Sequence, residues 1–200
     1  VLHGAGLMSF AHFAFLLEPH NPYRRIIGFD TFEGFPSLTA IDAKGQSRNL
    51  KPGAYRDDSL DELIALAQIH EDFRFLKSRP QIELVKGDIC QTVPAYIQEH
   101  PELVVALLYL DADLQAPTRT CLKHLVPRMP KGGVVVFDEL AMREFPGETA
   151  AVVETLGLSA QVKLLCSDID THVLQAAARG VYPAEARGLS PERLRRHFLR

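Results

Sequence analysis

The chain has 200 residues, of which 46% are hydrophobic, enough for one domain with a full core, so disordered, collagen-like and low-complexity proteins are excluded. The formal net charge of -3 argues against a protein that binds nucleic acid, because such proteins usually need a basic surface. No apolar run is long enough to span a bilayer, and three widely spaced cysteines indicate reduced cytoplasmic thiols rather than disulfides or a zinc site.

Short β-rich runs alternate along the chain with longer runs of helical spacing. We expect strands at residues 26–29, 82–85, 103–110, 134–137 and 162–165, and helices at residues 7–17, 59–75, 92–98, 118–126 and 147–156. Ser59 and Glu62 have the spacing of a capping box at the start of the second helix. Residues 1–6 look like the end of a strand that enters a glycine turn, so we expect the first strand of the fold to lie before Val1.

The alternation predicts an α/β fold with a doubly wound, mostly parallel sheet and helices on both faces, in one domain over residues 1–178. The runs at 103–110 and 134–137 are continuously apolar, which is typical of strands buried on both faces, and Tyr109 is expected to pack in the core. The long loop 30–58 is expected to be a lid, with surface disorder as the alternative. Residues 179–200 form a basic tail that we expect to be a short solvated helix.

Successive predicted strands end on carboxylates, and in open parallel sheets ligands bind beyond those strand ends. Two strands that should be near neighbours carry four of these acids: Asp111, Asp113, Asp138 and Glu139. Carboxylates that converge in this way repel one another unless a cation lies among them, and all-oxygen ligands suit Mg²⁺, Ca²⁺ or Mn²⁺. The alternative is that one pair caps the following helix or pairs with Arg119 or Lys123.

Asp30 and Asp88 are better suited to a nucleoside. An acid that ends the second strand of such a sheet typically accepts the ribose hydroxyls, and a glycine turn before it, here Gly4-Ala5-Gly6, lets the backbone approach the ligand closely. The alternative for Asp30 is an Asx turn that begins before Thr31.

Five segments carry a family resemblance: FDTFEGFP at 29–36, KGDI at 86–89, YLDAD at 109–113, FDE at 137–139 and FPGET at 145–149. In this order they resemble the macrocin O-methyltransferase-like family, the S-adenosylmethionine-dependent sugar O-methyltransferases of antibiotic biosynthesis. The resemblance covers residues 1 to 156 and implies a class I methyltransferase fold of the Rossmann-like type and a requirement for Mg²⁺ or Mn²⁺. It further implies a small hydroxylated acceptor, such as a sugar, and neither nucleic acid nor a membrane as partner.

The resemblance also implies roles for single residues. The cofactor-binding residues would be Gly4 and Gly6 in the first loop, Asp30 and Thr31 at the ribose, and Gly87, Asp88 and Ile89 near the adenine. The metal ligands would be Asp111, Asp138 and Glu139. Either Asp113 or Asp111 would be the general base.

Methyl transfer to a hydroxyl fits this set of residues. The enzyme must hold oxygen, methyl carbon and sulfur in line, and a cation chelated by two adjacent hydroxyls would acidify the reacting one while a carboxylate accepts its proton. Two alternatives stay open: a metal-dependent nucleotide-sugar glycosyltransferase that uses Asp111 and Asp113, and a non-catalytic relative that binds the cofactor. A cytoplasmic location and association with a second copy are further expectations.

Overall fold

The computed structural model describes residues 1–155 of the chain. The elements, in order, are η1 (Leu2–Gly4), α1 (Ala5–Leu17), β1 (Ile26–Asp30), η2 (Asp42–Lys44), α2 (Leu60–Phe73), β2 (Ile82–Lys86), α3 (Ile89–Glu99), β3 (Leu107–Leu110), α4 (Gln115–Leu125), η3 (Val126–Arg128), β4 (Val134–Phe137) and α5 (Pro146–Thr155). The strand expected at 162–165, the tail 179–200 and the domain boundary at 178 lie outside the described residues.

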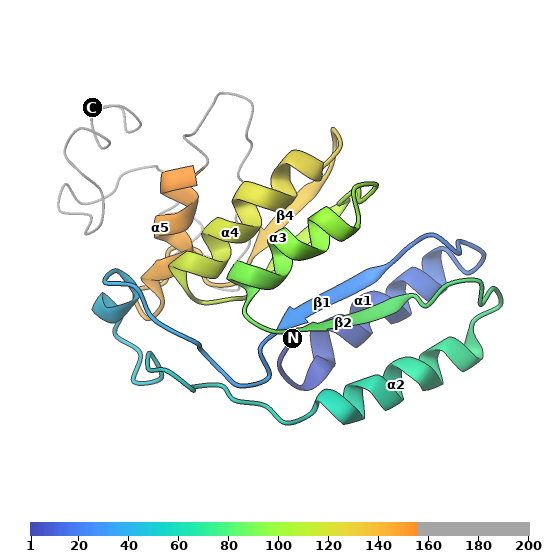
Figure 1. Cartoon of the computed structure of the whole chain (residues 1–200), viewed down its shortest axis with the longest axis horizontal. Coiled ribbons are helices and arrows are strands. Elements are labelled where there is room, and N and C mark those ends of the chain that lie inside the picture. Colours follow the sequence, from blue (N-terminus) through green and yellow to red (C-terminus); the bar gives the residue numbers. More distant parts are fainter. Residues whose placement is uncertain (156–200) are drawn as a thin grey trace, which may run out of the picture. The chain divides into compact units, whose positions relative to one another are not determined.

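The strands form two parallel pairs: β1 with β2, which lie side by side in Figure 1, and β3 with β4. The register places Asp30 opposite Lys86 in the first pair and Leu110 opposite Phe137 in the second. Parallel pairs joined by helices confirm the expected α/β class. Within residues 1–155 the two pairs are not hydrogen-bonded to each other, so the described strands stand as two parallel pairs rather than one continuous sheet.

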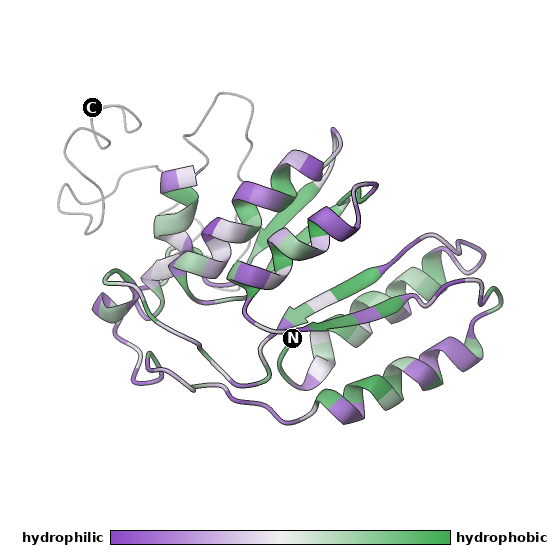
Figure 2. Ribbon diagram, in the orientation of Figure 1, coloured by the Kyte–Doolittle hydropathy of each residue, from purple (hydrophilic) through white to green (hydrophobic). Residues whose placement is uncertain are grey.

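Apolar side chains hold each pair to its helices, and Figure 2 shows strands that are mostly apolar beside helices with mixed surfaces. Leu7 and Ala11 of α1 form a buried cluster with Ile82 of β2. In the second half of the described chain, α4 packs against α3 and α5, with Leu122 and Val152 buried. None of the helices in residues 1–155 combines the length and apolar character needed to cross a membrane.

Strand β3 is shorter than the sequence predicts and is not buried on both faces. It begins at Leu107, because Leu103 N donates to His100 O in a turn and Val105 N donates to Arg128 O. Its exposure then alternates, and Tyr109 has 41% of its surface exposed. The expectation that Tyr109 packs in the core is therefore wrong in the described part of the chain.

The start of α2 also differs from the prediction. Ser59 is the N-cap residue, but its side chain makes no capping hydrogen bond. Its Oγ donates instead to Asp57 Oδ2 at 2.7 Å, and its amide donates to Asp57 Oδ1 at 3.0 Å. The expected capping box does not form because Asp57, buried just before the helix, engages the serine.

The long loop between β1 and α2 is attached to the second half of the described chain. Asp42 is fully buried, and its Oδ1 accepts the amide of Gln115 at the start of α4 at 2.9 Å. Its Oδ2 accepts the amide of Thr39 at 2.8 Å, and Gln46 N donates to Arg143 O. The loop is thus packed rather than disordered, while its role as a lid stays a prediction.

Candidate active site

The carboxyl ends of β1 and β2 bring together the residues expected at the nucleoside. Gly87 has a φ of +140° and donates its amide to Asp30 O at 2.8 Å, which continues the pairing beyond the strands. Asp88 is the N-cap residue of α3, where its Oδ1 accepts the amide of Cys90 at 2.9 Å, and Ile89 begins that helix. Asp30 and Asp88 therefore lie at the same edge of the β1–β2 pair, as predicted, and each also accepts a main-chain amide of the residues that follow it.

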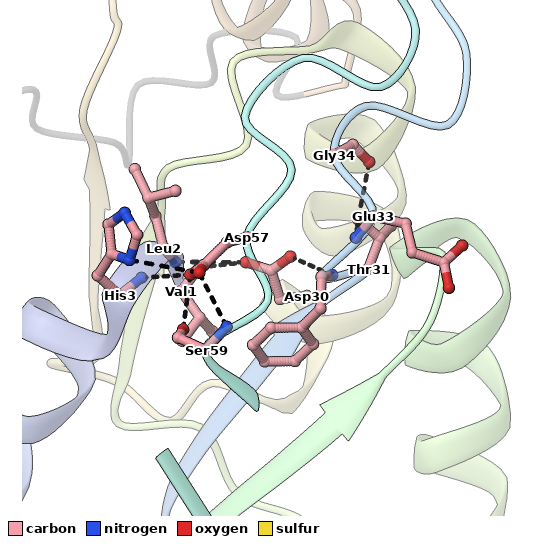
Figure 3. A network of polar contacts seen from close by, with 10 residues as sticks. Val1, Leu2, His3, Asp30, Thr31, Glu33, Gly34, Asp57 and Ser59 are labelled. Atoms are coloured by element: carbon pink, nitrogen blue, oxygen red, sulfur yellow. Dashed lines mark hydrogen bonds and ion pairs between the residues drawn. The ribbon is translucent and has the colours of Figure 1, made fainter. Parts of the chain in front are cut away.

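Asp30 forms the Asx turn that was the alternative interpretation (Figure 3). Its Oδ1 accepts the amide of Phe32 at 2.8 Å, and its Oδ2 accepts the amino group of Val1 at 2.7 Å. Thr31 turns inward, with Oγ1 donating to Gly34 O at 2.7 Å. Oδ2 also accepts the amide of Leu2 at 3.4 Å, whereas Oδ1 accepts the amide of Phe32 alone, so Oδ1 can still receive a hydroxyl.

The glycines expected in the cofactor loop occupy different conformations. Gly4 has a φ of +76°, and a Cβ there would collide with Leu63 of α2. Gly6 is helical and lies in the first turn of α1, beside open space. Asp57, which no sequence motif marks, is buried, and its Oδ2 accepts the amide of His3 at 2.6 Å, so it holds this loop against the start of α2 (Figure 3).

The carboxyl ends of β3 and β4 place two acids side by side. Asp111 and Asp138 follow directly on Leu110 and Phe137, which are register partners, and Asp138 N donates to Leu110 O at 3.0 Å. The hydroxyl of Tyr109 donates to Asp138 Oδ1 at 3.0 Å. The predicted convergence of the two acidic segments is therefore present, and Tyr109 contributes to it from the exposed face of β3.

The acids at this edge oppose one another's ionisation. Burial and the charge of Asp138 raise the pKa of Asp111 and the pKa of Glu139 above their ordinary values. Burial and the charge of Asp111 raise the pKa of Asp113 to about 7. Shifts of this kind arise when carboxylates share a small region, and a bound cation would relieve them.

Their chemistry fits a hard divalent cation, which prefers oxygen ligands. Glu139 Oε2 is buried without a hydrogen-bond partner among the described residues, as expected of an oxygen that awaits a ligand. As they stand, however, no three side chains of residues 1–155 are gathered closely enough to hold a metal ion. The carboxylates after β3 and β4 suit Mg²⁺ or Mn²⁺, and their side chains would have to move for three of them to bind one ion.

The alternative roles for the acidic pairs are not seen in the described chain. Arg119 lies 3.5 Å from Glu154 and pairs with that residue. The start of α4 is bonded by Asp42 from the long loop, since Gln115 N donates to it. Neither of these interactions uses the acids after β3 and β4.

Glu148 is a further residue of this site that the sequence analysis did not single out. It lies in the first turn of α5, is fully buried, and accepts the amides of Ala112 and Glu139. Burial raises its pKa to about 7, against the opposite effect of these two amides. Its place in the FPGET segment is the one sequence signal for this residue, because its partners, the amides of Ala112 and Glu139, lie in other segments of the chain.

Comparisons with known proteins identify relatives of the chain. The family model described as macrocin-O-methyltransferase (TylF) matches residues 4–171. A Streptomyces olivaceus protein is 28% identical over 120 residues, which are 60% of this chain and 43% of the relative. Its name is 8-demethyl-8-(2,3-dimethoxy-alpha-L-rhamnosyl)-tetracenomycin-C 4'-O-methyltransferase. The match thus spans less than half the length of this curated relative.

Solved structures show the same relationship. The calicheamicin methyltransferase CalS11 has a TM-score of 0.78 and 38% identity, over 85% of this chain and 67% of that chain. Its apo structure, named as a TDP-rhamnose 3'-O-methyltransferase, has a TM-score of 0.66 and 37% identity, over 84% and 65%. The O-methyltransferase NovP shares the fold, with a TM-score of 0.61 and 21% identity, over 85% and 66%. Since the family model matches most of the sequence, the chain belongs to the macrocin-O-methyltransferase (TylF) family.

Proposed function

We propose that the protein transfers a methyl group from S-adenosylmethionine to a hydroxyl of a sugar in a natural product. The observation that carries this proposal is the pair Asp111 and Asp138, side by side at the ends of β3 and β4 in a chain of this family. The relatives support a sugar as the acceptor, because two of them are named as methyltransferases of a rhamnosyl compound or of TDP-rhamnose. Sugars of this type are the acceptors to test first.

The β1–β2 edge would hold the cofactor. Gly4 and Gly6 would let the sulfonium compound approach the start of α1, whose first turn has no side-chain cap. Asp30 would accept ribose hydroxyls through its remaining lone pairs, with Thr31 fixing the turn, and the segment Gly87-Asp88-Ile89 would border the adenine.

The β3–β4 edge would hold the acceptor. Asp111, Asp138 and Glu139 would hold a divalent cation, which when bound supplies Lewis acidity to the acceptor hydroxyl. Asp113 or Asp111 would accept the proton as the oxygen attacks the methyl carbon. Asp113 is not one of the proposed metal ligands, so its carboxylate would remain free to accept that proton. The site would have to align oxygen, carbon and sulfur, because a near-attack geometry lowers the barrier to methyl transfer.

The two alternative functions make different predictions. A glycosyltransferase would bind a sugar nucleotide with Mn²⁺ and ignore S-adenosylmethionine, and the family match argues against it. A non-catalytic relative would bind the cofactor but show no metal-dependent turnover. A cytoplasmic location and association with a second copy are further parts of the proposal.

The test is a calorimetric titration of S-adenosylhomocysteine into the purified protein, first with Mg²⁺ and then with EDTA. We expect binding in both conditions and a separate uptake of Mg²⁺ that Asp138→Ala removes, with cofactor affinity changed only a few-fold. Absence of binding in both conditions would refute the methyltransferase proposal. Equal Mg²⁺-dependent activity in Asp138→Ala would refute the metal assignment alone.

A further inference from the structure

A buried carboxylate joins the segments that follow β3 and β4. Glu148 has 0% of its surface exposed. Its Oε1 accepts the amide of Ala112 at 3.2 Å, and its Oε2 accepts the amide of Glu139 at 3.1 Å. Ala112 stands between the two acids after β3, and Glu139 is one of the two acids after β4. A single side chain of α5 thus spans both acidic segments.

The rest of the first turn of α5 is fixed in the same region. Thr149 Oγ1 accepts the amide of Ala141 at 2.8 Å, which adds a second bond to the segment after β4. On the other side, Gly147 approaches Asp42 and the start of α4 so closely that a Cβ would collide with both. Because these neighbours fix the helix start, the carboxylate of Glu148 has a defined position from which to hold the two amides.

The hydrogen bonds of Glu148 suit a role in orientation. Both of its oxygens receive main-chain amides, and hydrogen bonds to an ionised acceptor are stronger than those between neutral groups. Groups that hold the ligands of a metal site, without binding the ion themselves, commonly set the affinity of that site. We propose, on the basis of the methyltransferase function above, that Glu148 is a positioning residue: it sets the separation of the Asp111–Asp113 and Asp138–Glu139 segments and thereby their affinity for a divalent cation.

The matched variants are Glu148→Gln and Glu154→Gln. Both replace a carboxyl of α5 with an amide, but Glu154 accepts the side chain of Gln115 at 2.9 Å and makes no hydrogen bond to either acidic segment in the described chain. We expect Glu148→Gln to weaken Mg²⁺ binding by about 10- to 100-fold in calorimetry. We also expect faster hydrogen exchange at the amides of Ala112 and Glu139 by NMR. Glu154→Gln should change neither quantity.

A third variant separates position from charge. Glu148→Asp keeps the charge, but a side chain shorter by one methylene cannot reach both amides, so it should also weaken Mg²⁺ binding. If Glu148→Asp binds Mg²⁺ like the wild type while Glu148→Gln does not, charge alone matters and the inference is wrong. Wild-type affinity in Glu148→Gln, or a wild type that binds no Mg²⁺, overturns it as well. If Glu148→Gln does not fold, Glu148→Asp decides.

The experiment also distinguishes this inference from the function on which it rests. S-adenosylhomocysteine is titrated into the same samples. We expect all variants to bind it within a few-fold of the wild type, because Glu148 is bonded to Ala112 and Glu139 and not to the residues proposed to hold the cofactor. A wild type that does not bind it refutes the methyltransferase proposal. The exchange rates at Ala112 and Glu139 still report whether Glu148 holds them.

Discussion

The carboxyl of Glu148 should make the stability of the fold depend on pH in a direction that the structure dictates. Burial raises its pKa from 4.5 to about 7, and the charge of Asp113 adds to this effect. In the unfolded chain the carboxyl releases its proton near pH 4.5, whereas the folded protein keeps it until about pH 7. The folded state therefore binds more protons in this window, so stability falls as the pH rises through it.

The size of the effect follows from the shift. A pKa raised from 4.5 to about 7 corresponds to about 3 kcal/mol, at about 1.4 kcal/mol for each unit. Glu148→Gln does not titrate, so its own stability lacks this contribution at every pH. The advantage of the wild type over Glu148→Gln in free energy of unfolding should thus shrink by about 3 kcal/mol between pH 4.5 and a pH above 7.

The assay is urea denaturation of both proteins at intervals across this range, in EDTA so that no cation compensates the carboxylates. Glu154→Gln serves as the control, because it replaces a carboxyl on the same helix that is partly exposed and bonded to Gln115 rather than to the acidic segments. A difference between wild type and Glu148→Gln that stays constant from pH 4.5 to a pH above 7 would refute the reasoning, because it would mean that Glu148 titrates alike in the folded and unfolded states.

Three further substitutions have defined outcomes. Asp42→Ala leaves two amides without their acceptor and should lower the unfolding free energy in urea by about 2–5 kcal/mol, where a change below 1 kcal/mol would contradict the packed loop. Gly4→Ala should lower the free energy of unfolding by roughly 2–3 kcal/mol, because Gly4 has a positive φ and a Cβ there would collide with Leu63. Gly6→Ala should leave the free energy of unfolding unchanged or raise it by about 0.5–1 kcal/mol, since Gly6 is helical and faces open space. Equal shifts of the melting temperature in the two variants would show that the loop around Gly4 relaxes. Asp30→Ala should weaken S-adenosylhomocysteine binding by roughly 1–3 kcal/mol in calorimetry, and unchanged affinity would leave Asp30 only its turn.

Much of the fold follows from local sequence patterns. The β-rich runs predicted β1, β2 and β4, because a strand that packs against helices needs a short run of apolar residues of its own. For the run 103–110 the predicted strand begins four residues too early, because apolar character alone does not distinguish a strand from the turn that precedes it. Here Val105 is bonded to Arg128, and that contact is invisible in the local pattern.

The site divides in the same way. Asp111 and Asp138 could be predicted because each ends a strand, and parallel strands bring such ends to one edge. Asp42 and Glu148 could not, because their partners are main-chain amides that lie far away in sequence, at Gln115 and Ala112. Every residue except proline has a main-chain amide, so no sequence motif shows which amide a buried acid will accept.

The same buried acids explain how a group of repelling carboxylates keeps its place. The rise in the pKa of Asp113 from 3.8 to about 7 corresponds to about 4 kcal/mol that burial and its neighbours impose on the ionised form. The two amides on Glu148 lower its pKa, but burial outweighs them, because that pKa still rises to about 7. The bonds therefore do not cancel the cost at Asp113; what they do is fix the main chain of both acidic segments to α5. A cation would thus meet segments whose main chain is already held, and binding it would require the carboxylate side chains to turn rather than the backbone to move.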